Sequence, residues 1–273
     1  MSPARTGARL PVAALTPGTA RRLAPVWASL PADLRPVDDA ATAHVVAVDG
    51  GPGWTAVAAG ALDASRPPPV VVVDAPGPED VDAVRALARR ARETGTAVLL
   101  DRPWAAAPGV VAAAQRFGDR VADAVAVHVL ATAPVEASAS DHLAVEALGL
   151  LRAASGTRGV VVDAVRRLPS GVVVVGRLPR GGGLHLQVVR GGRGTTARLV
   201  AHSASAWTAV EVVGSGPGSR VTASSADADG LLVLPVDLEA AGRATWRRAA
   251  GAGGAAADLD DLADDLAAVA TGR

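Results

Sequence analysis

The 273-residue sequence contains no lysine, cysteine, asparagine, isoleucine or tyrosine, and aromatic residues make up only 2% of it. Without lysine, the chain has no side chain for Schiff-base chemistry, for acid catalysis by an ammonium group or for a Walker-type phosphate loop. Without cysteine, it can form no disulfide, thiolate nucleophile or cysteine metal site. These absences exclude several catalytic classes before any pattern is considered.

The charge balance is even, with 27 basic and 27 acidic side chains and a pI near 7.0, while 49% of the residues are hydrophobic. This composition is typical of a globular protein and argues against disorder and against a nucleic-acid partner. No apolar run approaches the ~20 residues that span a bilayer. The apolar stretch at residues 10–15 is also too short for a secretion signal. We therefore expect a cytoplasmic protein without a membrane segment.

Residues 1–120 alternate short Val-rich runs with helical patterns, which predicts βαβ units and a parallel sheet. The helical pattern that begins near Pro78 is the clearest, because it has acidic residues in its first turn, one apolar face and Gly95 at its end. Strands are expected at residues 10–15, 44–49, 70–74 and 96–101, and helices at 19–29, 53–64, 78–95 and 109–117. This half is expected to be a truncated Rossmann-like domain.

Residues 121–273 follow a different pattern, with alternating strands joined by glycine-rich turns. We expect a mostly antiparallel, open-faced sheet built from strands at residues 124–130, 160–166, 172–178, 184–190, 195–202, 207–213 and 230–236. A helix at 141–154 and a final acidic helix at 255–269 are expected to pack against it. The sequence thus predicts an α/β domain followed by an α+β domain, with the boundary near residue 120.

The order of these segments resembles the Gfo/Idh/MocA family of nicotinamide-dependent oxidoreductases. In that family a strand ending in Glu-Lys-Pro leads into a helix, a strand and a second helix, and residues 70–117 (from VVVVDAP to AAAQRF) follow that run. Residues 141–156 are similar to the family's helix with its catalytic His and Asp, and residues 207–220 to a strand-turn-strand of its second sheet. The resemblance covers about residues 8–240, and it implies NAD or NADP as the cofactor.

The motifs that carry the family's chemistry are altered here. The family's lysine corresponds to Ala75, and its His and Asp correspond to Glu146 and Gly149. His142 lies one helical turn before Glu146 and on a similar face. The resemblance therefore leaves His142 and Glu146 as the candidate catalytic residues, with displaced roles.

The dinucleotide fingerprint is also altered. A pyrophosphate needs glycines and free backbone N–H groups at the start of a helix. Here the candidate cofactor-binding residues are Thr16, Gly18, Thr19 and Asp74, with a single glycine in the turn and a preceding proline, Pro17, that has no N–H. Too few residues separate the possible strand at 34–37 from His44 to form a crossover helix. We therefore expect no cofactor, or NAD or NADP if one binds.

A ligand cleft is expected at the carboxyl ends of the parallel strands, where open α/β sheets bind their ligands. Asp101, Arg102 and Trp104 are the candidate cleft residues, and they would converge there with Asp74, His142 and Glu146. Arg102 could grip an anionic or hydroxylated ligand; alternatively, these are ordinary loop and helix polar residues. The five histidines show no metal-ligand spacing, and we read His128, His185 and His202 as the polar face of a sheet, so no metal is expected.

Three functions are compatible with these patterns. The first is a pseudoenzyme of the family that has lost hydride transfer and serves as a homo- or hetero-oligomeric partner through the open face of its C-terminal sheet. The second is an active NAD(P)-dependent oxidoreductase acting on a sugar-like or other hydroxylated substrate with displaced catalytic residues. The third is a module that binds a small molecule in the cleft.

Overall fold

A computed structural model describes residues 9–135, 140–214, 219–239, 241–251 and 257–271. The chain divides into two compact units. The first lies within Met1–Glu79, Ala83–Asp101 and Thr245–Leu259, and the second within Asp80–Asp82, Arg102–Ala244 and Asp260–Arg273. Both units are therefore built from separate stretches of sequence, whereas we expected a single boundary near residue 120.

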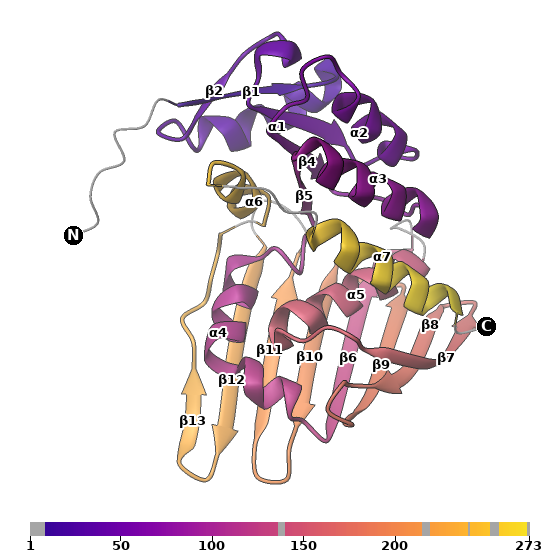
Figure 1. The fold of residues 1–273 in the computed structure, drawn as a ribbon. Helices are drawn as coiled ribbons and strands as arrows, with labels where there is room; N and C mark the ends of the chain where they lie inside the picture. The colour runs from indigo at the N-terminus through magenta and orange to yellow at the C-terminus, as the bar shows by residue number, and fades with distance from the viewer. Residues whose placement is uncertain (1–8, 136–139, 215–218, 240, 252–256, 272–273) are drawn as a thin grey trace. The chain divides into compact units, whose positions relative to one another are not determined.

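The first unit contains a five-stranded parallel sheet with the strand order β2-β1-β3-β4-β5 (Figure 1). The strands are β1 (Leu10–Ala14), β2 (Leu34–Pro36), β3 (Val45–Asp49), β4 (Val70–Asp74) and β5 (Ala97–Asp101). Four consecutive residues of β3, β4 and β5 are buried, as expected for parallel strands that are covered on both faces. This confirms the prediction of a Rossmann-like parallel sheet.

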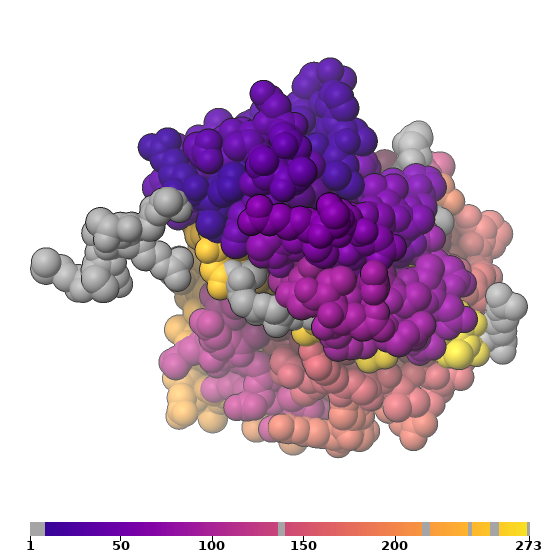
Figure 2. Space-filling model, turned by 45° about the horizontal axis from the view of Figure 1, so that its top comes forward, coloured from indigo at the N-terminus to yellow at the C-terminus, as the bar shows by residue number. Residues whose placement is uncertain are grey.

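Helices cover both faces of this sheet. They are α1 (Pro17–Ala28), α2 (Trp54–Leu62), α3 (Val81–Thr94) and α6 (Ala241–Ala249). Trp27 of α1 and Trp246 of α6 pack together in the core, edge to face, with ring centroids 5.4 Å apart. Helix α6 was not predicted from the sequence. Figure 2 shows the outer surface of this unit in indigo and purple.

The connection from β2 to β3 is as short as we expected. A single 3-10 turn, η1 (Ala40–Thr42), replaces the crossover helix, and Asp39 caps it by accepting a hydrogen bond from the Ala41 N–H at 2.9 Å. Helix α3 starts later than the pattern suggested, because Asp80 lies before the helix and accepts a hydrogen bond from the Asp82 N–H. The predicted start at Pro78 was therefore wrong by three residues.

The second unit contains an eight-stranded sheet with the order β13-β12-β11-β10-β6-β9-β8-β7. All neighbouring strands are antiparallel except β6 and β9, which confirms the expected mostly antiparallel sheet. The strands are β6 (Ala126–Ala133), β7 (Val161–Leu168), β8 (Gly171–Arg177), β9 (Gly183–Arg190), β10 (Thr196–His202), β11 (Trp207–Val213), β12 (Arg220–Asp227) and β13 (Gly230–Val233).

Two helices, α4 (Pro108–Ala122) and α5 (Ser140–Ser155), pack on one face of this sheet and against each other. Helix α4 contacts β10, β11 and β12, so it belongs to the second unit although it precedes the expected boundary. Helix α7 (Ala257–Thr271) carries the acidic pattern predicted for residues 255–269, of which the first two lie outside the described residues. Within the described ranges, no helix is long and apolar enough to cross a membrane.

Candidate functional site

The carboxyl edge of the first sheet carries a polar group that we call the Arg22 group: Thr16, Thr19, Arg22, Asp49 and Asp74. Asp49 and Asp74 end the adjacent strands β3 and β4, where they are register partners. Arg22, on α1, bridges them: its Nε donates to Asp74 Oδ2 at 2.8 Å and its Nη1 to Asp49 Oδ2 at 3.0 Å. Burial opposes the charged form of Arg22, but the two carboxylates outweigh it and raise its pKa.

The N-terminus of α1 satisfies its own donors. The Thr16 side chain caps the helix by accepting from the Thr19 N–H at 3.2 Å, and the Thr16 and Thr19 hydroxyls are 2.9 Å apart. Pro17 has no N–H to offer. Of the first three helical residues, Pro17 has no N–H and the Thr19 N–H donates to the cap, which leaves the N–H of Gly18. This is a weak anion site, since anion binding depends on several free N–H groups at a helix start.

The position of the family's lysine lies at the exit of β4. Ala75, which we expect at that position, has a φ of 50°, the only positive φ among the described non-glycine residues. Gly50, after β3, packs directly on this turn: its N–H donates to the Asp74 carbonyl at 2.9 Å, and a Cβ on Gly50 would lie 2.3 Å from the Ala75 carbonyl oxygen. The turn is therefore held by backbone contacts, and it provides no ionisable side chain at Ala75.

These residues do not fit a dinucleotide of the kind that the fold implies. Two carboxylates lie at the carboxyl edge of the sheet, where open α/β sheets bind their ligands, and one guanidinium is already paired with both of them. The helix start provides one N–H in place of a glycine-rich cradle. A Cβ added at Gly18 would meet only Thr16 Oγ1, at 3.9 Å, so that glycine does not mark a close backbone approach either.

The second unit holds a buried charge network around Arg102, which we call the Arg102 network. Arg102 Nε donates to Glu146 Oε1 at 3.0 Å, Nη1 to Asp265 Oδ2 at 2.9 Å and Nη2 to the Val145 carbonyl at 2.7 Å. Asp265, on α7, also accepts from Arg152 Nη2 at 2.5 Å. Burial alone would lower the pKa of Arg102, but the carboxylates of Glu146 and Asp265 outweigh it and raise the pKa. The network joins α5 to α7.

Arg102 fills the space beside Gly149, the position where we expect the family's Asp. A Cβ on Gly149 would lie 2.2 Å from Arg102 Nη2, so the guanidinium occupies the volume of any side chain there. Arg102 is 5% exposed, and its guanidinium donates hydrogen bonds to Glu146, Asp265 and the Val145 carbonyl. These contacts do not support the predicted role of Arg102 in binding a ligand. Trp104, expected near a cleft, is 1% exposed and lies in the core of the second unit.

His142 lies one turn before Glu146 on α5. Its pKa is lowered, chiefly because burial disfavours the imidazolium; the Glu146 carboxylate opposes this effect and Arg102 adds to it. The imidazole is therefore neutral at pH 7, the state in which it can accept a proton. The second oxygen of Glu146, Oε2, is buried and has no hydrogen-bond partner among the described residues.

The lowered pKa of His142 makes a prediction about stability. In the unfolded chain, His142 has its ordinary pKa of 6.5 and becomes protonated when the pH falls below that value. In the folded chain its pKa is lower, so it becomes protonated only at a lower pH. The stability that the neutral imidazole contributes is thus fully present above pH 6.5. It is lost as the pH falls from 6.5 through the lower pKa of the folded state. His142→Gln should therefore flatten the decrease in unfolding free energy between neutral and acidic pH, as measured by urea titrations. An unchanged pH slope would contradict the lowered pKa.

Most of the predicted site residues thus belong to one of two groups, one in each unit. Thr16, Gly18, Thr19 and Asp74 lie in or beside the Arg22 group, while Arg102, His142 and Glu146 lie in or beside the Arg102 network. Asp101 ends β5 in the first unit and accepts a hydrogen bond from Thr245 Oγ1 at 3.1 Å.

Four members of these groups were not predicted from the sequence: Arg22, Asp49, Arg152 and Asp265. Asp49 carried a signal, because it ends a Val-rich strand just as Asp74 does. Asp265 carried none, since its partners are more than a hundred residues away in the sequence. Across the described ranges, no group of three or more His, Asp or Glu side chains is placed to hold a metal ion.

A parallel α/β unit of this strand order, followed by a unit with an open, mostly antiparallel sheet, defines the two-domain fold of Gfo/Idh/MocA-type oxidoreductases. No known family model and no curated protein sequence matches the chain.

Solved structures do match it along almost its whole length. The chain is similar to the UDP-N-acetylglucosamine 3-dehydrogenase GnnA from Acidithiobacillus ferrooxidans, with a TM-score of 0.71, 14% identity and coverage of 98% of this chain and 97% of that one. It is also similar to KijD10, a 3-ketoreductase from Actinomadura kijaniata solved with NADP and TDP-benzene, with a TM-score of 0.70, 16% identity and coverage of 97% and 98%. For GenD2 from gentamicin A biosynthesis, solved with NAD, the TM-score is 0.63 at 17% identity, with coverage of 98% and 96%.

These similarities confirm the predicted fold. At 14–17% identity they establish the fold alone. The presence of NADP and NAD in the matching structures identifies the dinucleotides to test, and it gives no support to the expectation that this chain binds no cofactor.

Proposed function

We propose that this chain is a Gfo/Idh/MocA-type protein that does not transfer hydride and that serves as a subunit, pairing through the open face of its C-terminal sheet. The observation that carries the proposal is the Arg22 group. Arg22 is held by Asp49 and Asp74 at the edge of the sheet where a dinucleotide would lie, and Thr16 uses the Thr19 N–H at the helix start.

The second unit supports the same proposal. Glu146, at the position of the family's catalytic His, is tied to Arg102. Gly149 has no side chain, and its side-chain space is filled by the Arg102 guanidinium. Ala75 replaces the lysine that assists proton transfer in the family. Three positions that carry the family's chemistry are thus occupied by residues that cannot perform it in the same way.

The proposal predicts that the protein does not bind NADH or NADPH saturably at millimolar cofactor. The two carboxylates of the Arg22 group repel phosphates, and the helix start provides only one N–H. Nicotinamide fluorescence titrations measure this directly. Asp49→Asn with Asp74→Asn removes the repulsion and should allow weak, salt-sensitive binding to appear. The control variant, Asp33→Asn with Asp63→Asn, removes the same charge elsewhere in the first unit and should not allow cofactor binding. Tight binding to the unaltered chain would overturn the proposal.

A second candidate function is favoured by His142. Its neutral, partly buried imidazole lies beside a carboxylate, an arrangement that suits a general base. In this alternative, the chain is an NAD(P)-dependent oxidoreductase on a sugar-like or other hydroxylated substrate, with His142 as the proton-transfer residue. If the titration finds a cofactor, His142→Ala should leave cofactor affinity unchanged and reduce turnover.

A further inference from the structure

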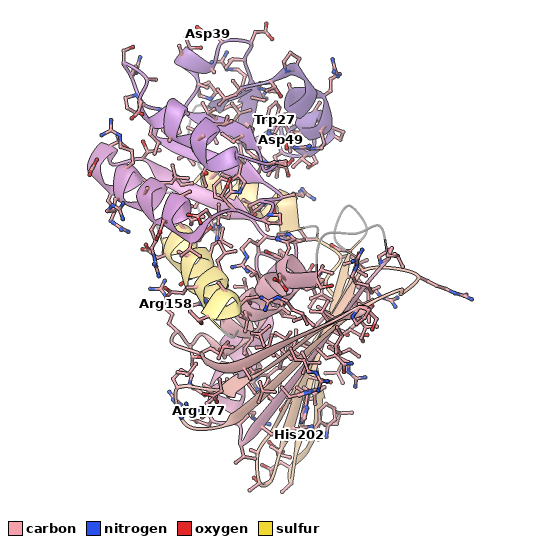
Figure 3. All side chains as sticks on the ribbon, turned by 90° about the vertical axis from the view of Figure 1, so that its right-hand side faces the viewer. Trp27, Asp39, Asp49, Arg158, Arg177 and His202 are labelled. Carbon is pink, nitrogen blue, oxygen red and sulfur yellow. The ribbon has the colours of Figure 1, made fainter. Side chains whose placement is uncertain are left out.

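The second sheet has one face that no helix covers in the described part of the unit, and we call it the open face. Helices α4 and α5 lie on the other face, where alternate residues of the central strands are buried. On the open face the strands present large apolar side chains, such as Leu130 on β6 and Val175 on β8, each 44% exposed. Figure 3 shows side chains standing on this face, with His202 labelled.

Three of the five histidines of the chain lie together on the open face. His202, His128 and His185 come from β10, β6 and β9, the three central strands of the sheet. His128 and His185 are direct register partners, with ring centroids 5.8 Å apart, and His128 and His202 are diagonal neighbours with centroids 6.0 Å apart. All three side chains are exposed. We call them the histidine row, with His128 in its middle.

The spacing of these rings suits a shared transition-metal ion. Imidazole is a good ligand for Zn²⁺, Ni²⁺ and Cu²⁺. With Zn–N bonds of about 2.0–2.1 Å, two rings that share one tetrahedral ion have centroids roughly 5 Å apart. The pairs in the row, at 5.8 and 6.0 Å, are wider than this by less than about 1 Å, a difference that rotation of these exposed side chains can close. Within one chain, either His128 and His185 or His128 and His202 could bind one ion. Among the described residues, no group of three or more side chains is placed to do so.

A pair of imidazoles is half of the set that Zn²⁺ prefers, since structural zinc sites have four protein ligands. Two-fold pairing of identical faces brings the same residues together twice. A second copy of this chain, with its open face against the first, would supply the missing two imidazoles. The row lies on the middle strands of the sheet, where such a pairing would be centred, and neighbouring apolar side chains would be buried with it.

We propose that the histidine row is a transition-metal site that joins the open faces of two copies of this chain, with His128 as the shared ligand in each copy. This proposal rests on the pairing named in the proposed function. Beside the row, Arg198 on β10 and Glu211 on β11 are direct cross-strand partners on the open face, and Arg177 on β8 is ion-paired with Asp163 on β7. Each pair neutralises its own charges beside the histidine row.

Size-exclusion chromatography with light scattering tests the proposal on the full chain, treated with EDTA and then supplied with Zn²⁺ or Ni²⁺. We expect monomers in EDTA and dimers with metal. His128→Ala should remain monomeric in both and should lose metal affinity by at least about tenfold, since even groups outside the ligand shell cost that much. His185→Ala and His202→Ala each leave one pair, so each should lose less. Gln187→Ala, also exposed and two residues from His185 on β9, is the matched control and should behave as the unaltered chain.

The other outcomes separate the metal site from the pairing. A dimer that persists in EDTA and in the His128→Ala variant would overturn the metal site and leave the pairing standing. Monomers under all conditions would overturn both. Metal binding by a monomer, measured by competition with a chelating dye, would overturn the bridge between copies.

Discussion

Replacing Arg102 with methionine should destabilise the second unit by about 3–5 kcal/mol, the usual cost of breaking a buried ion pair from one side. The variant leaves Glu146 buried beside an apolar side chain, and its Oε2 already has no partner among the described residues. Asp265 keeps the hydrogen bond from Arg152. The cost therefore falls mainly on Glu146, and it is measured as the free energy of unfolding in urea.

The matched variant removes both charges. Arg102→Met with Glu146→Leu should recover much of the loss, because apolar replacements of similar volume can be as stable as a buried ion pair. If the single variant unfolds with the free energy of the unaltered chain, the network is not the stabilising contact between α5 and α7 that its geometry indicates. If the double variant is no better than the single one, packing and not charge is the cause.

Replacing Trp246 with alanine should cost the first unit about 3–5 kcal/mol, the range found for deleting a large buried aromatic side chain. Trp246 is fully buried and packs edge to face on Trp27. Such an aromatic pair stabilises the folded state beyond what the burial of its apolar surface contributes. Amide hydrogen exchange in β1, β3 and β4 measures the loss in the unit concerned.

Trp207→Ala is the control for this change, because Trp207 is 38% exposed and lies on the open face of the second sheet. It should leave exchange in the first unit unchanged. Equal protection of β1, β3 and β4 in the Trp246→Ala variant and the unaltered chain would show that α6 is not required for the first unit's core.

Most of the fold could be predicted from local patterns. The Val runs of β3 and β4 and the glycine turns of the second half indicate strands of two kinds, because burial on one or both faces leaves its own periodicity. Helix α6 was missed because it is short and rich in arginine, and its one large apolar residue, Trp246, is isolated in the sequence. The start of α3 was misplaced because Pro78 and Asp80 are both plausible at a helix start.

The candidate sites could be predicted only in part. The absence of the lysine and of the glycine-rich turn is visible in the sequence, because the resemblance to the family predicts where both would lie along the chain. The pairing of Arg22 with Asp49 and Asp74 is not, because register between strands brings the two carboxylates side by side. Arg102 was considered as a ligand-binding or an ordinary polar residue, and its ion pair could not be predicted, because its partner Asp265 is brought to it by α7, far away in the sequence.

The return of the chain end to the first unit has a consequence for synthesis. Trp246 and Asp258 belong to that unit, and the Leu100 N–H of β5 donates to the Asp258 side chain at 3.0 Å. A ribosome that has translated the whole parallel sheet has therefore not yet made the residues that close its core. The N-terminal unit can become fully stable only after translation is almost finished, when the second sheet has already been made, so the first part of the protein to be translated is not the first to be completed.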